Sequence, residues 1–300
     1  MTTVEAAPAA IKRKRRVTLA DSLAGAWTVA RLTLREALRR RFSLAALLVA
    51  ALYVALAFLP IHVSRQRQEM LGPLLTQFTE ALMSTYGAEM IEFFCFLFAV
   101  ALSAGAISAE IERGTLAVIV PKPLPRWAIY LGKLVGVNLF LIPLLIGLTT
   151  LLQWSLWMHV GHTSPNLWRA MPVMYLYPLL FSCLTLCLSS FAGSLLSNIL
   201  PLILASAAWS EGTLRALGYF FDVQSLKLAA KTVVYILPLN PMSRWLERAL
   251  NFAILQQFPL GRNHPWPPDP PAGALDLFWI LGYAAAFLVV GLVVFTKRDF

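Results

Sequence analysis

Two glutamates near the start of an apolar segment have the type and spacing that could support proton chemistry. Glu89 and Glu92 are three residues apart, which places both carboxyl groups on one face of a helix. Burial disfavours the charged form of a carboxyl group, so such a pair could take up a proton or contact a cation. Glu211, near the end of another apolar segment, has the same potential. The alternative is that all three are solvent-exposed at a membrane interface and have no proton-linked role.

Other arrangements that could support catalysis or nucleotide binding are incomplete. The segment LGKLVG, from Leu131 to Gly136, lacks the upstream glycine and the hydroxyl residue that a phosphate-binding loop needs. Cys183 and Cys187 have helical spacing, but no histidine or carboxylate is near them, which favours small buried residues over metal ligands. We therefore expect no catalytic residue, no metal and no cofactor in this chain, and no enzymatic activity of its own.

The composition indicates the class of protein that must position these residues. Hydrophobic residues make up 58% of the chain and charged residues only 13%, with a mean hydropathy of +0.68. Soluble domains carry roughly a quarter charged residues, so this chain could not cover a water-exposed surface. The composition therefore predicts an all-α integral membrane protein. The formal net charge of +10 is then a signal of membrane topology, and nucleic acid is not an expected partner.

Six apolar segments have about the length that crosses a bilayer. They are Phe42–His62, Met90–Ser108, Trp127–Val160, Met171–Leu196, Ile199–Phe220 and Leu275–Phe295. The third is too long for one straight crossing, so we expect it to tilt or to project beyond the bilayer. Only the short stretch GSLLSN separates the fourth and fifth, which indicates a tight helical hairpin.

The N-terminal region predicts a basic cytosolic arm over residues 1–20 and an amphipathic helix over residues 21–41. Asp21 or Ser22 is the expected N-cap of this helix. Apolar and basic residues fall on opposite faces: Leu23, Trp27, Ala30, Leu34 and Leu38 on one, and Arg31, Arg35, Arg39 and Arg40 on the other. This pattern favours a helix lying flat at the membrane interface, its arginines among the headgroups. The alternative is a cytosolic helix that packs on a partner.

The distribution of Lys and Arg predicts the orientation of the spans. Ten basic residues precede the first span, which places the N-terminus in the cytosol. Six crossings then return the C-terminus to the cytosol, and they also place the connector between spans two and three there. Residues 222–274 disagree with this rule, because the basic residues Lys227, Lys231, Arg244, Arg248 and Arg262 would lie outside. Long loops obey the rule weakly, so we expect six spans and an extracytoplasmic segment over 222–274.

The connector between spans two and three, residues 109–126, is short and unusually charged. Glu110 and Glu112 follow the second span at once, and Gly114 permits a sharp break. The prolines of PKPLP then prevent a continuous helix and redirect the chain. The pattern predicts a rigid elbow at the cytosolic surface, which suits the transmission of force. The alternative is an ordinary loop with charged ends.

The connector and the C-terminus carry a resemblance to a known family. The stretch EIERGTLAVIVPKPLPRWAIYLGK resembles the signature of type-2 ABC-transporter permeases, and the ending FTKRDF is similar to the family's usual tail. The residues that fall on the pattern are Glu110, Glu112, Arg113, Gly114, Thr115, Leu116, Lys122, Pro123, Arg126, Gly132 and Lys133. The amphipathic N-terminal helix and the six-span plan match as well, so the likeness covers essentially the whole chain.

The resemblance implies a fold, a set of partners and a location. It implies a six-span permease domain over residues 42–300, in which the connector forms a cytosolic coupling helix. That helix would dock in a groove of a separate ABC ATPase subunit, which binds the ATP and Mg. A second permease copy would complete the complex, with a homodimer preferred over a heterodimer. The bacterial cytoplasmic membrane is the implied location, with both termini cytosolic.

Two functions remain open at this stage. The first is transport, in which the chain is the permease of an ATP-driven exporter. The second is a mechanochemical scaffold that passes ATPase strokes to an extracytoplasmic protein without moving a solute. Residues 222–274 could dock such a protein. Mild polar residues within the spans favour transport; they are Ser103, Asn138, Gln153, Ser182, Thr185, Ser189 and Ser190.

Overall fold

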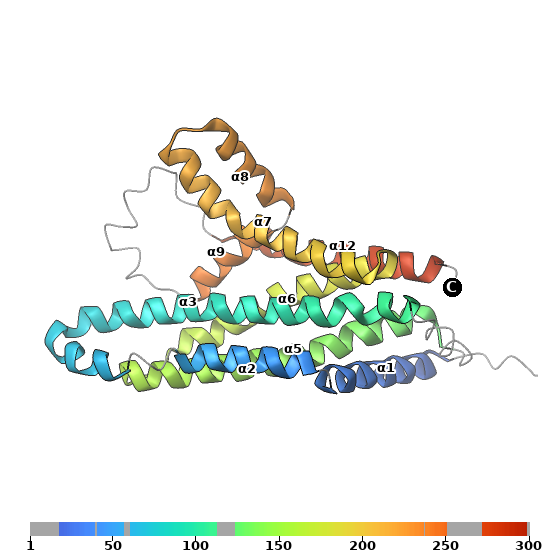
Figure 1. The fold of residues 1–300 in the computed structure, drawn as a ribbon, viewed down its shortest axis with the longest axis horizontal. Coiled ribbons are helices and arrows are strands. Elements are labelled where there is room, and N and C mark those ends of the chain that lie inside the picture. Colours follow the sequence, from blue (N-terminus) through green and yellow to red (C-terminus); the bar gives the residue numbers. More distant parts are fainter. Residues whose placement is uncertain are drawn as a thin grey trace, which may run out of the picture.

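Long helices running along one common axis make up most of the structure (Figure 1). This computed structural model describes residues 18–39, 41–56, 61–112, 124–236, 238–250 and 272–298. Within these ranges all regular secondary structure is helical: α1 (Leu19–Arg39), α2 (Arg41–Leu56), α3 (Ile61–Glu112), α5 (Arg126–Val160), α6 (Pro165–Phe191), α7 (Ser194–Phe220), α8 (Gln224–Ile236), α9 (Leu239–Leu250) and α12 (Ala274–Lys297). The predicted all-α fold class is confirmed.

Four helices are long and apolar enough to cross a membrane. They contain the candidate spans Gln77–Glu112, Arg126–Met158, Pro165–Phe191 and Ala274–Lys297. These correspond to the predicted second, third, fourth and sixth spans. Helix α2 has only 16 residues, and α7 is not among the four, so the count of six crossings stays a prediction.

Several predicted boundaries are wrong. Helix α3 has 52 residues, or about 78 Å at 1.5 Å per residue, so it is far longer than a bilayer crossing. Its N-terminal half passes through the polar stretch that lies between the first and second predicted spans. The turn between α6 and α7 lies at Ala192 and Gly193, earlier than GSLLSN suggested. Ala192 has an extended backbone there and Gly193 is the N-cap of α7, so Ser197 already belongs to that helix.

Helix α1 begins earlier than predicted, and neither Asp21 nor Ser22 is its N-cap. The N-cap is Thr18, whose hydroxyl accepts a hydrogen bond from the Asp21 N–H at 3.2 Å. The Asp21 carboxylate in turn accepts from the Thr18 N–H at 3.2 Å. This reciprocal arrangement is a capping box, in which two otherwise unsatisfied backbone donors are bound.

Helix α1 lies alongside α5 (Figure 1). Its axis runs in the same direction as the long axis of the bundle (Figure 1). A Cβ atom added to Gly132 would lie 2.6 Å from the Ala26 carbonyl oxygen, and one added to Gly136 would lie 2.6 Å from the Ala30 carbonyl oxygen. Only glycine therefore allows this contact, and LGKLVG serves helix packing. The large apolar residues of α1, such as Trp27, stay exposed on another face. Contact of that face with lipid stays a prediction.

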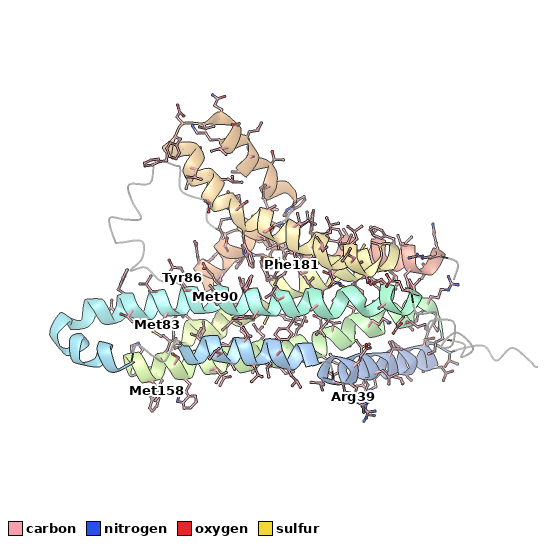
Figure 2. All side chains as sticks on the ribbon, in the orientation of Figure 1. Arg39, Met83, Tyr86, Met90, Met158 and Phe181 are labelled. Atoms are coloured by element: carbon pink, nitrogen blue, oxygen red, sulfur yellow. The ribbon has the colours of Figure 1, made fainter. Side chains whose placement is uncertain are left out.

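The buried core contains a cluster of aromatic rings between α3, α6 and α7. The Phe96 and Phe181 rings meet edge to face, with their centroids 4.5 Å apart, and Phe181 lies inside the bundle in Figure 2. By contrast, Arg39 at the end of α1 points away from the bundle. A second buried cluster, which includes Ile107, Tyr130 and Phe295, packs α3, α5, α6 and α12 together near the connector. The parts of α3, α5, α6 and α12 beside the connector thus pack on one another through apolar side chains.

Helices α8 and α9 occupy the segment that disagreed with the charge rule. Helix α8 folds back on α7, and α8 together with the C-terminal part of α7 stands away from the other helices (Figure 1). The basic residues have specific partners: Lys227 binds the Asp222 carboxylate at 2.6 Å, and Arg244 binds the Asp276 carboxylate at 3.0 Å. Arg248 donates to the Ala272 carbonyl at 2.5 Å. These contacts join α8 to the turn after α7 and α9 to the start of α12, and the side of the membrane on which the segment lies stays a prediction.

Candidate functional site at the connector

The two ends of the connector lie at one end of the bundle, where α3 finishes and α5 begins. Of the predicted coupling residues, the structure describes Glu110, Glu112, Arg126 and Lys133. The others, Arg113, Gly114, Thr115, Leu116, Lys122 and Pro123, lie outside the described residues. The four described side chains all bind neighbouring helices. Together with Ser189 and Arg298 they form a group that we call the connector clasp.

Glu112, the last residue of α3, caps the start of α7. Its carboxylate accepts a hydrogen bond from the Ser194 N–H at 2.9 Å and another from the Ser194 hydroxyl at 3.0 Å. The first turn of a helix has backbone N–H groups without partners, and a negative charge there is favoured by the helix dipole. Glu112, at the first end of the connector, therefore binds the start of α7 directly.

Lys133 and Glu110 form a buried ion pair between α5 and α3. The Lys133 ammonium lies 2.5 Å from the Glu110 carboxylate and also donates to the Ala106 carbonyl of α3. Lys133 is only 4% exposed. A buried ammonium is costly unless it is paired and hydrogen-bonded, and here it has both kinds of partner. The pair therefore fixes the last turns of α3 to the start of α5.

Ser189 of α6 binds the backbone of α3 just before Glu110. Its hydroxyl accepts from the Ser108 N–H at 3.0 Å and from the Ile107 N–H at 3.2 Å, and donates to the Ala104 carbonyl at 2.7 Å. A buried hydroxyl with these partners is fully satisfied. Because the contacts go to backbone atoms, they join α6 to α3 whatever side chains surround them.

Two arginines connect the other helix ends. Arg126, at the start of α5, donates to the Thr296 carbonyl at 3.2 Å and to the Arg298 carbonyl at 2.5 Å. The Arg298 guanidinium donates to the Ser190 carbonyl at 2.7 Å. Carbonyls in the last turn of a helix lack intrahelical partners, and positive charge is favoured there. Arg126 thus holds the end of α12, and Arg298 holds the end of α6.

The connector clasp has the features of a mechanical joint rather than of a reaction centre. It ties the ends of α3, α6 and α12 to the starts of α5 and α7 through charge-assisted hydrogen bonds. Charge-assisted hydrogen bonds are shorter and stronger than hydrogen bonds between neutral groups. The ends of these five helices are therefore joined to one another by direct side-chain contacts.

The predicted carboxylates Glu89, Glu92 and Glu211 lie elsewhere and do not form one group with the clasp. Glu89 is exposed on α3, whereas Glu92 is buried. Glu211 of α7 is buried, and it accepts a hydrogen bond from the Asn240 amide at 3.2 Å. Arg215 lies 3.7 Å from the Glu211 carboxylate. These partners give Glu211 a structural role that joins α7 to α9.

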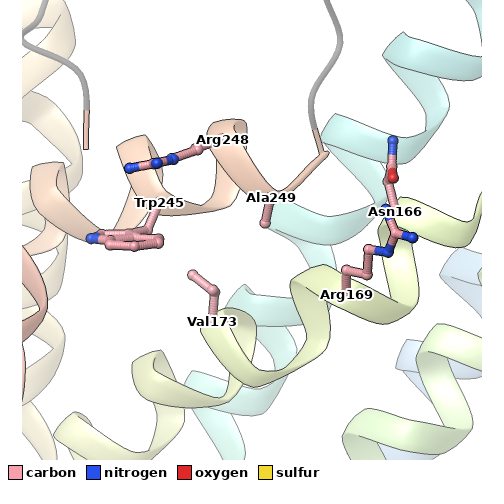
Figure 3. A pocket seen from close by; sticks show the side chains of 6 residues that line it. All are labelled: Asn166, Arg169, Val173, Trp245, Arg248 and Ala249. Atoms are coloured by element: carbon pink, nitrogen blue, oxygen red, sulfur yellow. The ribbon is translucent and has the colours of Figure 1, made fainter. Parts of the chain in front are cut away.

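A second candidate surface is a pocket between α6 and α9. It has a volume of about 360 Å³ and is lined by Asn166, Arg169, Val173, Trp245, Arg248 and Ala249. In Figure 3 the Arg248 guanidinium lies near the Trp245 ring, and Arg169 and Asn166 lie at the opposite side. The Arg248 guanidinium is 5.2 Å from the centre of the Trp245 ring. A pocket with an indole face and Arg248 at one side and Arg169 at the other suits an apolar group that carries a negative charge (Figure 3).

Sequence reasoning identified part of the clasp and missed some of its partners. Glu112 and Arg126 were singled out, but their acceptors and donors on α7 and α12 were not. The serine after Gly193 was the available signal, because a Gly-Ser turn between two apolar helices predicts a capped helix start. No local pattern indicated that Lys133 would reach Glu110, since that contact depends on how α3 and α5 pack.

The chain is similar in sequence to known transporter proteins. A family model described as "ABC-2 family transporter protein" matches residues 27–300. The chain is also similar to the "Probable ABC transporter permease protein NosY" of Stutzerimonas stutzeri, with 39% identity over 123 residues. The matched part spans 40% of this chain and 42% of that relative.

Proposed function

This chain belongs to the ABC-2 family of transporter proteins, and we propose that it is the membrane-spanning subunit of an ATP-driven exporter. It is a multi-pass membrane protein. The observation that supports an ATP-driven role most directly is the connector clasp. A charged connector whose two ends are bound to five helix ends suits a part that receives movement from a partner.

The proposed working complex contains a separate cytosolic ABC ATPase, which binds ATP and Mg and docks on the connector. The permease itself supplies the bilayer-crossing helices and no catalytic residue. A second permease copy completes the complex, and a homodimer is the preferred form. Residues 109–126 act as the coupling segment, with Arg113, Gly114, Thr115, Leu116, Lys122 and Pro123 in the part that faces the ATPase.

In the proposed mechanism, ATPase movement displaces the connector, and the clasp distributes that displacement. Glu112 passes it to α7, and Arg126 passes it to α12. Because Ser189 and Lys133 keep the end of α3 attached to α6 and α5, the bundle moves as connected helices rather than as separate rods. The result is alternating exposure of a substrate path to the two sides of the membrane.

The second candidate function is a mechanochemical scaffold with an extracytoplasmic partner. Two observations favour it: the C-terminal part of α7 and α8 stand away from the bundle (Figure 1), and the pocket beside Trp245 lies between α6 and α9 (Figure 3). A partner with an acidic, apolar segment would suit this pocket. In this version the same clasp drives the movement, but its output is a change at α7, α8 and α9.

The proposed function predicts a stable complex with an ATPase. Purification of the tagged full chain from its host membrane in mild detergent should yield a second subunit that carries a phosphate-binding loop, identified by mass spectrometry. The complex should hydrolyse ATP, because the ATPase subunit supplies the catalytic residues. A chain that purifies only with itself or with an extracytoplasmic protein, and without any ATPase, would contradict the proposal.

The proposed six-span topology predicts which sites an impermeant maleimide can reach. The background is a variant in which the buried residues Cys95, Cys183 and Cys187 are replaced by alanine. Thr163→Cys and Ser225→Cys place a thiol at exposed positions of the α5–α6 turn and the start of α8, and both should react in intact cells. Thr296→Cys, exposed near the end of α12, should react only after permeabilisation.

Each thiol reports on a different part of the topology. Protection of Ser225→Cys in intact cells would show that α7 does not cross the membrane. Labelling of Thr296→Cys from outside would place the C-terminus, and with it the connector clasp, on the wrong side for a cytosolic ATPase.

A further inference from the structure

Glu92 is a carboxylic acid enclosed in the bundle next to a wall of aromatic rings. Its residue is 9% exposed, and it lies in the candidate span Gln77–Glu112. The ring of the next residue, Phe93, lies 5.1 Å from the Trp209 ring, and the Phe96 ring lies 5.6 Å from it. Trp209 stacks on Tyr177 at 5.9 Å. Three helices, α3, α6 and α7, therefore surround this region with apolar surface.

Glu92 differs from the two other carboxylates that the sequence suggested. Glu89 is exposed on the surface of α3, and Glu211 is bound by Asn240 and lies near Arg215. Within the described residues, Glu92 has no hydrogen bond or ion pair. The charge that acts on it is that of another carboxylate, Glu89. An ionised carboxylate in this setting would be buried beside a like charge, which is strongly unfavourable.

A second buried polar group near Glu92 also lacks a partner. The Tyr177 hydroxyl has no hydrogen bond within the described residues, and its residue is almost fully buried. It lies within electrostatic range of the Glu92 carboxyl group. A buried polar group without a partner is uncommon in proteins and calls for an explanation, such as a bound ligand. Glu92 of α3 and Tyr177 of α6 thus bring two polar side chains to the same apolar part of the bundle.

We propose that Glu92 and Tyr177 form a proton-binding site within the membrane bundle, in which the Glu92 carboxyl group carries the proton in the state described by the structure. A proton on Glu92 removes the buried charge, and a small side-chain movement would let the neutral carboxyl group form a hydrogen bond with the Tyr177 hydroxyl, which has none in the part of the chain that the structure describes. Any movement that admits water beside Glu92 would release the proton. The site therefore links proton exchange to the opening of α3, α6 and α7.

The surrounding groups favour a proton over a metal cation. The ionisable residues of the helices packed around this part of α3 include Glu89 and Cys95 of α3 itself, Tyr177 of α6, Glu211 and Arg215 of α7, and Glu247 of α9. Within the described residues, no three side chains of the types His, Cys, Asp and Glu are grouped so that they could hold a metal ion. A metal cation needs several oxygen ligands together, whereas a proton needs only one carboxyl group.

Infrared spectroscopy of the full chain in lipid nanodiscs tests the proposal directly, without any ATPase or substrate. A protonated carboxyl group gives a carbonyl band that an ionised carboxylate does not. At neutral pH the wild-type chain should show this band, and Glu92→Gln should lose it. Glu89→Gln and Glu211→Gln are matched controls that should keep it. Tyr177→Phe should shift the frequency of the band, because it removes a polar hydroxyl group from the surroundings of the Glu92 carboxyl group.

The result that would overturn the proposal is a Glu92 carboxyl group that is ionised at neutral pH. A wild-type chain with side-chain ¹³C-labelled glutamate provides the second measurement, because it reports protonated glutamate whether or not the Glu92→Gln variant folds. Absence of a protonated band from labelled glutamate, or a band that Glu92→Gln leaves unchanged, would exclude the site. Since these readouts do not involve ATP, their failure would leave the proposed transport function untouched.

Discussion

Replacing Glu110 with alanine is expected to lower the free energy of unfolding by about 3 kcal/mol, because it leaves a buried charge without its partner. The Lys133 ammonium, 2.5 Å from the Glu110 carboxylate, would keep only the Ala106 carbonyl among the contacts described above. A neutral carbonyl satisfies a hydrogen bond but does not cancel the charge. The measurement is denaturant or thermal unfolding of the full chain in nanodiscs, followed by near-ultraviolet circular dichroism.

A double-mutant cycle separates the ion pair from the packing of α3 on α5. Lys133→Ala should cost less than Glu110→Ala, because the Glu110 side chain is 28% exposed and water can reach its carboxylate once the pair is broken. The combination Glu110→Leu with Lys133→Met should recover most of the loss, since an apolar pair of similar size is often as stable as a buried ion pair. A Glu110→Ala variant as stable as the wild type would show that the pair does not hold α3 to α5.

Much of the fold followed from local features of the sequence. The scarcity of charge predicted an all-helical membrane protein, and four of the predicted spans coincide with helices of the right length and hydropathy. Glu110, Glu112, Arg126 and Lys133 were identified because charged residues beside long apolar runs are unusual and matched a family pattern. These predictions needed only the composition and the order of residues, which a single sequence contains.

Contacts between distant segments could not be predicted in the same way. LGKLVG gave no sign of its partner, yet Gly132 and Gly136 are what allow α1 to approach α5 closely. The polar stretch before Met90 did not predict a helix, although α3 is continuous from Ile61. The basic residues Arg244 and Arg248 contradicted the charge rule until their partners at the start of α12 were known. All three depend on tertiary packing.

The candidate site shows the same division. The charged residues of the connector indicated that it is functional, and the sequence analysis predicted that they contact a partner protein. The structure gives Glu112, Arg126 and Lys133 partners within the chain, so these residues link the connector to the bundle. Glu92 was one of three equivalent carboxylates in the sequence, and only its burial and its lack of a partner within the described residues distinguish it.

Loss of the Glu112 cap is expected to reduce coupling between the ATPase and the permease. Glu112→Lys removes both hydrogen bonds to Ser194 and puts a positive charge at the start of α7. Loss of a cap costs about 1 kcal/mol, and the reversed charge adds some tenths to 1 kcal/mol. If the coupled movement depends on this contact, ATP turnover by the complex should fall by about tenfold. Gly114→Pro, which stiffens the break in the connector, should have an effect in the same direction.

Two matched variants determine how Glu112 acts. Glu112→Gln keeps an acceptor for the Ser194 N–H and a second polar group for its hydroxyl, so it should retain most of the turnover if the contact with α7 is what matters. Lys12→Glu changes the sign of a charge in the N-terminal arm and should have little effect, since exposed charges typically contribute under about 1 kcal/mol. All variants should still insert in the membrane, because none lies in the hydrocarbon core.

The most direct test of the central claim is ATP turnover by the purified ATPase and the full chain, reconstituted together in nanodiscs. The claim is that the connector transmits ATPase movement to α7 through Glu112. It predicts nearly normal permease-dependent turnover for Glu112→Gln and Lys12→Glu, and a loss of about tenfold for Glu112→Lys. Wild-type turnover in Glu112→Lys would contradict the claim. So would a Glu112→Gln variant as impaired as Glu112→Lys, because the charge would then matter to the ATPase rather than to α7.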